Sequence, residues 1–297
     1  QLDYQYVTPD QILKSDSLKS YPMLILPFTI AADGALVAKL QQYVQDGGVL
    51  VGDLRCLRTD AHGKPEPGTA LQQLFGVKRT GKADYGPTAL KFTAQAEGID
   101  MGNRELALYG REGLEATGAQ ALAAHATGEP AVLWQRHGKG LSLYLNFNLP
   151  RYDEGVRELL RQVVQRAGVR REVTVEQLTG DAPPRAYELN TFTRSPITVY
   201  GLIRDFRRVE DSDPVRVNFG QATHVYDMRA RKYLGKVATT QLTLPPGDTA
   251  LYACLPYTVS ALRVTVPAKV APGAELAVTA RLTADGKPGD HVFHVEL

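Results

Sequence analysis

Hydrophobic positions near the start of the chain predict a strand, a helix and a second strand. A continuous apolar run from Met23 to Leu26 is typical of a strand buried on both faces. Apolar residues then recur at helical spacing from Leu36 to Val44, with Asp33 as the expected N-cap and Gly47-Gly48 as the expected stop. A second buried strand follows at Val49 to Val51. We therefore expect a βαβ unit in a mostly parallel sheet.

The spacing of hydrophobic residues changes near residue 170. A last amphipathic helix is predicted where apolar residues recur between Val156 and Val164. Beyond it, short alternating runs are separated by Pro, Gly and Asp, a rhythm that favours an antiparallel, immunoglobulin-like β-sandwich. The alternation starts again after Pro256, and the runs at 262–266, 274–282 and 291–297 predict the opening strands of another immunoglobulin-like domain.

Several segments together resemble one known domain. They are Tyr21 to Arg58, Leu71 to Val77, Pro130 to Leu133, and His137 to Leu145. In this order they resemble the glutamine-amidotransferase-like domain that serves as the trimerisation domain of glycoside hydrolase family 42 β-galactosidases. The resemblance implies an α/β, flavodoxin-like fold of the class I glutamine-amidotransferase type for the first part of the chain.

Together these observations predict three regions. Residues 1–170 are expected to form the amidotransferase-like α/β domain, without the strand and helix that normally come first in that family. Residues 171–257 are expected to form a β-sandwich, and residues 258–297 the start of a truncated immunoglobulin-like domain.

Leu2, Tyr4 and Tyr6 alternate like a strand, so we expect the chain to be a fragment of a longer polypeptide. A signal peptide would then lie outside the fragment, so the compartment, either the bacterial cytoplasm or the exterior, stays open.

Composition narrows the possible partners. The 297 residues carry a formal net charge of +2, which gives no electrostatic reason to expect nucleic acid. No apolar run approaches the roughly 20 residues that span a bilayer, so no membrane partner is expected. Among six histidines only His291 and His294 are close, and strand alternation places them on opposite faces. We therefore expect no metal and no cofactor, and two free thiols at Cys56 and Cys254.

The scaffold is an enzyme's, yet its reactive groups are missing. An amidotransferase needs a thiolate, a histidine base and a carboxylate that orients the histidine. Leu54 stands about where the cysteine of an amidotransferase would be, and Cys56 comes two residues later than that position. Asn146 stands where the family's histidine would be, and an amide cannot take a proton. We therefore predict no catalytic residue, while a stand-alone amidotransferase or amidohydrolase that uses Cys56 stays open as an alternative.

The sequence also offers no identifiable residues for glycoside hydrolysis. Hydrolysis of a glycoside needs two carboxylates that flank the bond to be broken. The family 42 β-galactosidases carry these carboxylates on a (β/α)8 barrel, and no segment of this chain matches that barrel. Glu105, Glu112 and Glu115 lie close in sequence, but a solvated polar segment is the better interpretation.

Two groups of residues remain as candidate binding sites. Asp53, Arg55 and Arg58 should emerge at the carboxyl edge of the sheet, where they are candidates to bind a small anionic or sugar ligand or to form a salt bridge with a neighbouring domain or subunit. In the β region, four aromatic residues could stack on sugar rings, although alternating aromatic positions more often belong to the core: Tyr200, Phe206, Tyr226 and Tyr233.

The hypothesis that fits best is a non-catalytic accessory and oligomerisation region of a larger bacterial glycoside hydrolase of the β-galactosidase type. Its expected partners are an upstream catalytic barrel and other copies of itself, with a trimer implied by the resemblance. A carbohydrate-binding or sensor module is the other alternative that stays open.

Overall fold

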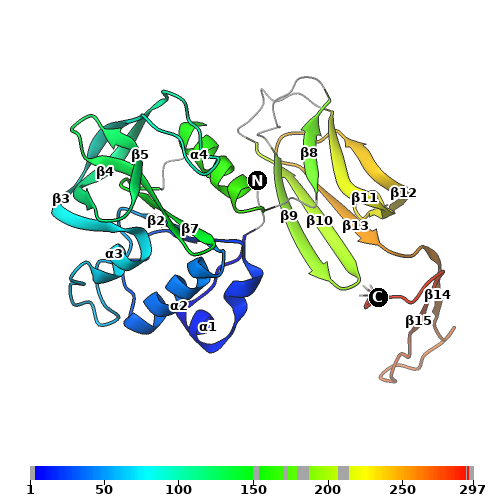
Figure 1. Cartoon of the computed structure of the whole chain (residues 1–297). Helices are drawn as coiled ribbons and strands as arrows, with labels where there is room; N and C mark the ends of the chain where they lie inside the picture. Colours follow the sequence, from blue (N-terminus) through cyan, green and yellow to red (C-terminus); the bar gives the residue numbers. More distant parts are fainter. Residues whose placement is uncertain are drawn as a thin grey trace. The chain divides into compact units, whose positions relative to one another are not determined.

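A computed structural model describes residues 4–149, 154–169, 173–178, 187–206, 214–291 and 293. The chain divides into two compact units, Tyr6–Arg170 and Arg171–Leu297, the second together with Gln1–Gln5 (Figure 1). The predicted division into 1–170, 171–257 and 258–297 stays a prediction. Residues 4–8 form no strand, so the alternation at the start of the chain does not lead to one in the described part.

The first unit contains helices on a seven-stranded sheet. Its helices are α1 (Pro9–Lys14), the 3₁₀ helix η1 (Ser17–Ser20), α2 (Gly34–Gln45), α3 (Thr69–Phe75) and α4 (Glu154–Arg166). Its strands are β1 (Met23–Leu26), β2 (Val49–Asp53), β3 (Val77–Phe92), β4 (Glu105–Ala116), β5 (Gln120–His125), β6 (Pro130–His137) and β7 (Gly140–Leu145). The predicted βαβ unit is thus present as β1, α2 and β2, and Asp33 caps α2 by accepting a hydrogen bond from the Leu36 amide at 2.7 Å.

The sheet is mixed, and the prediction of an α/β flavodoxin-like domain is wrong. Its strand order is β1-β2-β7-β6-β5-β3-β4, in which only β1, β2 and β7 are parallel neighbours. The other four strands join by antiparallel pairing. A flavodoxin-like sheet needs a crossover helix after each parallel strand, whereas between β2 and β7 the chain makes the short α3 and four antiparallel strands.

The long β3–β4 hairpin is the main reason for the difference. Along β4, every second residue from Leu106 to Leu114 is buried, which is the period of a strand with one covered face. Two of these buried positions are Gly110 and Glu112, which are not hydrophobic, so the sequence shows only a weak alternation of hydrophobic and polar residues along β4. This strand pattern was therefore hard to distinguish from a polar loop.

Two separate cores cover the two faces of the sheet. The first contains Leu50 with residues of α1, α2 and α3, and the second contains Val49 and Val51 with residues of α4. Figure 1 shows α4 on the opposite side of the sheet from α2 and α3. Since successive residues of a strand point to opposite faces, β2 contributes to both cores in turn.

The second unit consists of strands in its described part. They are β8 (Thr174–Gln177), β9 (Tyr187–Arg194), β10 (Ile197–Arg204), β11 (Val215–Asp227), β12 (Lys232–Leu242), β13 (Thr249–Leu255), β14 (Val259–Thr265) and β15 (Thr279–Ala284). The first six form one sheet, because β11 pairs with β8 and β12 along its first half and with β12 and β13 along its second. Buried residues from these strands form one hydrophobic core, and the predicted immunoglobulin-like sandwich stays a prediction.

The last two strands form a hairpin of their own. β14 and β15 pair only with each other in the described residues, and Leu262 and Val264 are more than half exposed.

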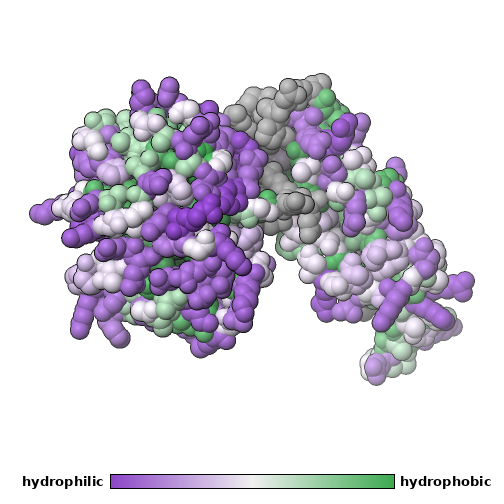
Figure 2. Space-filling model, viewed as in Figure 1, coloured by the Kyte–Doolittle hydropathy of each residue, from purple (hydrophilic) through white to green (hydrophobic). Residues whose placement is uncertain are grey.

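Hydrophilic residues predominate on the face of the molecule that Figure 2 shows, with smaller apolar areas between them.

Two glycines, one at the start of α2 and one at the start of β7, offer a matched test of backbone packing. A Cβ on Gly140 would lie 2.0 Å from the Val44 carbonyl oxygen and 2.4 Å from that of Gly48, whereas a Cβ on Gly34 would meet nothing within 4 Å. We expect Gly140→Ala to lower the free energy of unfolding by about 2 kcal/mol or more, because backbone must move to admit the methyl group. Gly34→Ala, at the first turn of α2, should be neutral or stabilising by up to about 1 kcal/mol. Urea denaturation measures both, and equal effects would contradict this packing.

Candidate functional site

The carboxyl ends of the three parallel strands meet at one edge of the first sheet. Pro27 and Phe28 follow β1, the segment from Leu54 to Arg58 follows β2, and Asn146 follows β7. In sheets of this kind the carboxyl edge is where ligands and catalytic groups are held. The structure therefore places all three predicted ligand-binding residues, Asp53, Arg55 and Arg58, at the expected edge.

Asp53 is fully buried, and its carboxylate is used by the backbone. One oxygen accepts a hydrogen bond from the Phe28 amide at 3.1 Å and the other from the Arg55 amide at 3.0 Å. Burial raises the pKa of Asp53, while these amide donors act against that rise. Asp53 therefore joins the loop after β1 to the loop after β2, and Phe28 keeps a positive φ of 50° there.

Arg58 belongs to a buried ion cluster. Its guanidinium donates to both carboxylate oxygens of Glu112, at 2.8 and 3.2 Å, and to the Leu54 carbonyl at 2.8 Å. Arg79 of β3 donates to the same carboxylate at 3.1 Å and to the carbonyls of Cys56 and Leu57. Glu112 is only 3% exposed. One buried carboxylate therefore holds two arginines and, through them, the loop that follows β2.

Glu112 is the residue that the sequence interpretation missed. Glu105 and Glu115 are exposed, as expected for a solvated segment, but the same interpretation is wrong for Glu112. A signal was present, since Glu112 falls in phase with Leu106, Leu108 and Leu114 on the buried side of β4. A glutamate in an apolar phase needs a cationic partner, and Arg58 and Arg79 are the partners.

Arg55 differs from Arg58 in its surroundings. Its guanidinium carbon lies 5.1 Å from the centre of the Phe28 ring and 4.8 Å from that of the Tyr85 ring. Cation–π contacts of this kind favour Arg and fix the guanidinium plane. Whether Asp53, Arg55 and Arg58 bind a small ligand stays a prediction, but two of the three already use their charged groups within the chain.

Cys56 lacks the environment of a nucleophile. Its side chain is fully buried, and burial, reinforced by the neighbouring Asp53 charge, raises the pKa of the thiol to about 12. Asn146 is also fully buried, and its side-chain amide donates to the carbonyls of Glu112 at 2.9 Å and Pro130 at 2.8 Å. Both residues therefore pack as structural groups in the described part of the chain.

The remaining titratable residues assemble no further centre in the described part of the chain. There, no three His, Cys, Asp or Glu side chains come together in a way that could hold a metal ion. His291 is hydrogen-bonded to Tyr257 at 2.9 Å, and its sequence neighbour His294 lies outside the described residues. A search of the described helices for one with the length and hydrophobicity to span a bilayer finds none.

The four aromatic candidates of the β region separate into different environments. Tyr200 is 6% exposed and belongs to the core of the second unit, whereas Phe206 is 70% exposed. Tyr226 and Tyr233 lie side by side, with ring centres 4.8 Å apart. Their hydroxyl groups are occupied, since Tyr226 accepts from the Val259 amide and Tyr233 bonds to His224. Sugar stacking on this pair stays a prediction.

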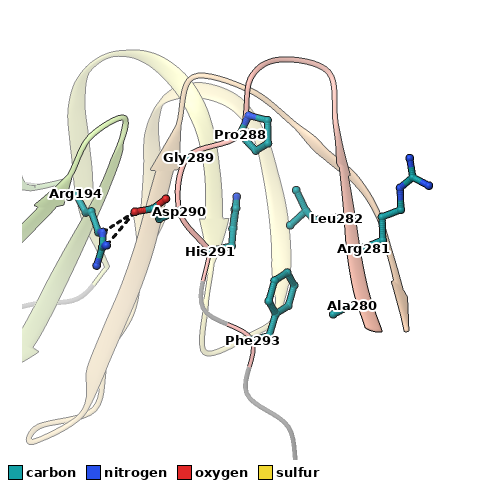
Figure 3. Close-up of a pocket in the computed structure, with 9 residues that line it drawn as sticks. All are labelled: Arg194, Ala280, Arg281, Leu282, Pro288, Gly289, Asp290, His291 and Phe293. Carbon is teal, nitrogen blue, oxygen red and sulfur yellow. Dashed lines mark hydrogen bonds and ion pairs between the residues drawn. The ribbon is translucent and has the colours of Figure 1, made fainter. Parts of the chain in front are cut away.

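The second unit also has an open depression of about 590 Å³ (Figure 3). It lies between β15 and the segment from Pro288 to Phe293, and Leu282 and Phe293 line it while Arg281 points away. At its rim Arg194 and Asp290 form an ion pair at 2.9 Å. Arg194 and Asp290 thus neutralise each other, and Arg281 is the other charged residue of the described lining.

Comparison with known proteins gives one family match. A family model described as the β-galactosidase trimerisation domain matches residues 2–170. A comparison with curated proteins finds no match.

Similar folds occur in solved structures of glycosidases. A β-galactosidase from Bacillus circulans sp. alkalophilus superimposes with a TM-score of 0.63 at 14% identity, over 82% of this chain and 34% of that one. A cold-adapted β-galactosidase from Rahnella sp. R3 gives 0.58 at 18% identity, over 78% and 32%. The α-L-fucosidase isoenzyme 2 from Paenibacillus thiaminolyticus gives 0.53 at 14% identity, over 82% and 42%. The chain thus spans about a third of the length of the β-galactosidases that it resembles, and at these identities the likeness shows the fold alone.

Removing the charge of Glu112 tests the buried ion cluster. We expect Glu112→Gln to lower the free energy of unfolding by about 3 kcal/mol, because it leaves two partly buried guanidinium groups without an anion. The matched control is Glu105→Gln in the same strand, where the carboxylate pairs with Lys91 at 3.4 Å and both side chains are more than half exposed. Its cost should stay within about 1 kcal/mol. Urea denaturation compares the two, and similar losses would contradict a special role for Glu112.

Thiol alkylation tests the assignment of Cys56. With a pKa of about 12 and no exposed surface, Cys56 should resist iodoacetamide at pH 8 in the folded protein and react in urea. Cys254, whose pKa burial also raises to about 12, should behave alike and serves as the internal control. Peptide mass spectrometry locates the modified residue. Selective and rapid labelling of Cys56 in the native state would favour the nucleophile alternative.

Proposed function

Because the chain belongs to the family of β-galactosidase trimerisation domains, we propose that it is the assembly region of a larger glycoside hydrolase. In this proposal the first unit joins three copies of the protein, and a catalytic barrel elsewhere in the same polypeptide hydrolyses the glycoside. The observation that carries the proposal is the match over residues 2–170, which covers most of the first unit.

The residues at the carboxyl edge of the first sheet support a structural role for this region. Cys56 is buried, with the pKa of its thiol raised to about 12, and Asn146 donates its amide hydrogens to two carbonyls. Arg58, Arg79 and Glu112 satisfy one another. These groups hold loops in place, and a stable set of loops is what a subunit contact requires.

The share of the chain covered by the solved structures supports the larger protein. A chain that spans about a third of two β-galactosidases leaves room in each of them for a (β/α)8 barrel, which takes about 250 residues. The substrate of the whole protein follows from that barrel and not from this region. We therefore propose β-galactoside hydrolysis for the whole protein on the family match alone.

Two masses test the proposal. An antibody raised against this chain of 32.5 kDa should detect, under denaturing conditions, a polypeptide of about 70 kDa or more, because a barrel must be added. Sedimentation equilibrium of the native protein should then give three times the denatured mass. A denatured mass near that of this chain would contradict the larger enzyme. A native mass equal to the denatured mass would contradict assembly.

A further inference from the structure

Arg55 presents a guanidinium group that feels the charge of nearby Asp53 but pairs directly with no carboxylate of the described residues. Its neighbours Arg58 and Arg79 share the Glu112 carboxylate. Arg55 makes no side-chain hydrogen bond or ion pair within the described residues, and its Nε atom is buried without a partner there. Both oxygens of nearby Asp53 accept backbone amides. A guanidinium has five donors in a planar fork that suits a carboxylate, so Arg55 has donors to offer to another molecule.

The position of Arg55 is fixed by three separate segments. Phe28 from the loop after β1 and Tyr85 from β3 both contact its guanidinium, at 5.1 and 4.8 Å from the ring centres. Asp53 holds the Arg55 amide from one side and the Phe28 amide from the other. The group is therefore held in place before any partner arrives, which lowers the entropy that binding must cost.

The residues around Arg55 leave apolar surface in water. Phe28 is 36% exposed, Tyr85 44% and Ile30 44%. Ile30 lies in the same loop as Phe28, and its carbonyl accepts the amide hydrogens of Arg58 and Thr59. Aromatic residues and arginine are the types that concentrate at the centres of protein interfaces, where they contribute most of the binding energy.

We propose that this cation–aromatic patch, formed by Phe28, Ile30, Arg55 and Tyr85, docks against a second copy of this protein, which places a carboxylate on Arg55. The inference rests on the proposed assembly and adds the surface that performs it. A cyclic trimer has heterologous contacts, in which each copy uses two different surfaces. A cationic patch on one copy then needs an acidic counterpart on the next, and the chain supplies 32 acidic residues against 34 basic ones.

The test compares charge reversal at the two opposite edges of one sheet in the intact polypeptide. Arg55→Glu should raise the dissociation constant of the trimer by about 30-fold or more, the effect of losing an interfacial hot spot. Lys139→Glu makes the same change of charge at an exposed residue directly before β7, at the opposite edge, and should leave assembly unchanged. Sedimentation velocity over a dilution series measures all three proteins.

A second variant keeps the result interpretable if Arg55→Glu disturbs the fold next to Asp53. Ile30→Glu changes only an exposed side chain of the patch and should also weaken the trimer, with an unchanged circular dichroism spectrum. A trimeric wild type whose Arg55 and Ile30 variants both stay trimeric at every dilution would overturn this inference and leave the assembly proposal intact. A monomeric wild type would overturn the assembly proposal itself.

Discussion

The first unit depends on one buried carboxylate. Glu112 stands on the antiparallel half of the sheet, and the two arginines that neutralise it hold the loop that leaves the parallel half. Without an anion at this point, two partly buried guanidinium groups of like charge would face each other, which would cost a substantial part of the stability of a small domain. The cluster therefore joins the two halves of a mixed sheet and fixes the shape of the edge at which Arg55 emerges.

The polar groups at the same edge serve the structure of the loops. Chemistry needs polar groups that are held in place but remain free to meet a substrate. At this edge the polar groups instead form hydrogen bonds with each other or with the backbone, as is the case for Asp53, Arg58, Glu112 and Asn146. Each such bond stabilises the loops and removes a group from possible catalysis. Arg55 is the exception among the charged groups of this edge, since its guanidinium stacks on aromatic rings and forms no direct ion pair within the described residues.

The parts of the fold that the sequence predicted correctly are those with strong local signals. The run from Met23 to Leu26, the helix capped by Asp33 and the strand that begins at Val49 all depend on short-range chemistry, and the structure contains them. The mixed sheet could not be predicted in this way, because strand direction is decided by which distant segments pair. Glu112 was missed for the same reason: its partners lie 33 and 54 residues away in sequence. Position at the carboxyl edge was predictable for Arg55, but its freedom from internal pairing was not.

The alternation of β2 between two cores has a consequence for how this domain can vary. Leu50 belongs to one core and Val49 and Val51 to the other, so a one-residue insertion before β2 would exchange their places and mismatch both layers at once. The turn at Gly47-Gly48 must therefore keep its length. The segment from Leu54 to Arg58 that follows β2 is held by the Glu112 cluster and not by strand pairing. Natural variation among relatives should accordingly spare both the length of the turn before β2 and the ion cluster after it.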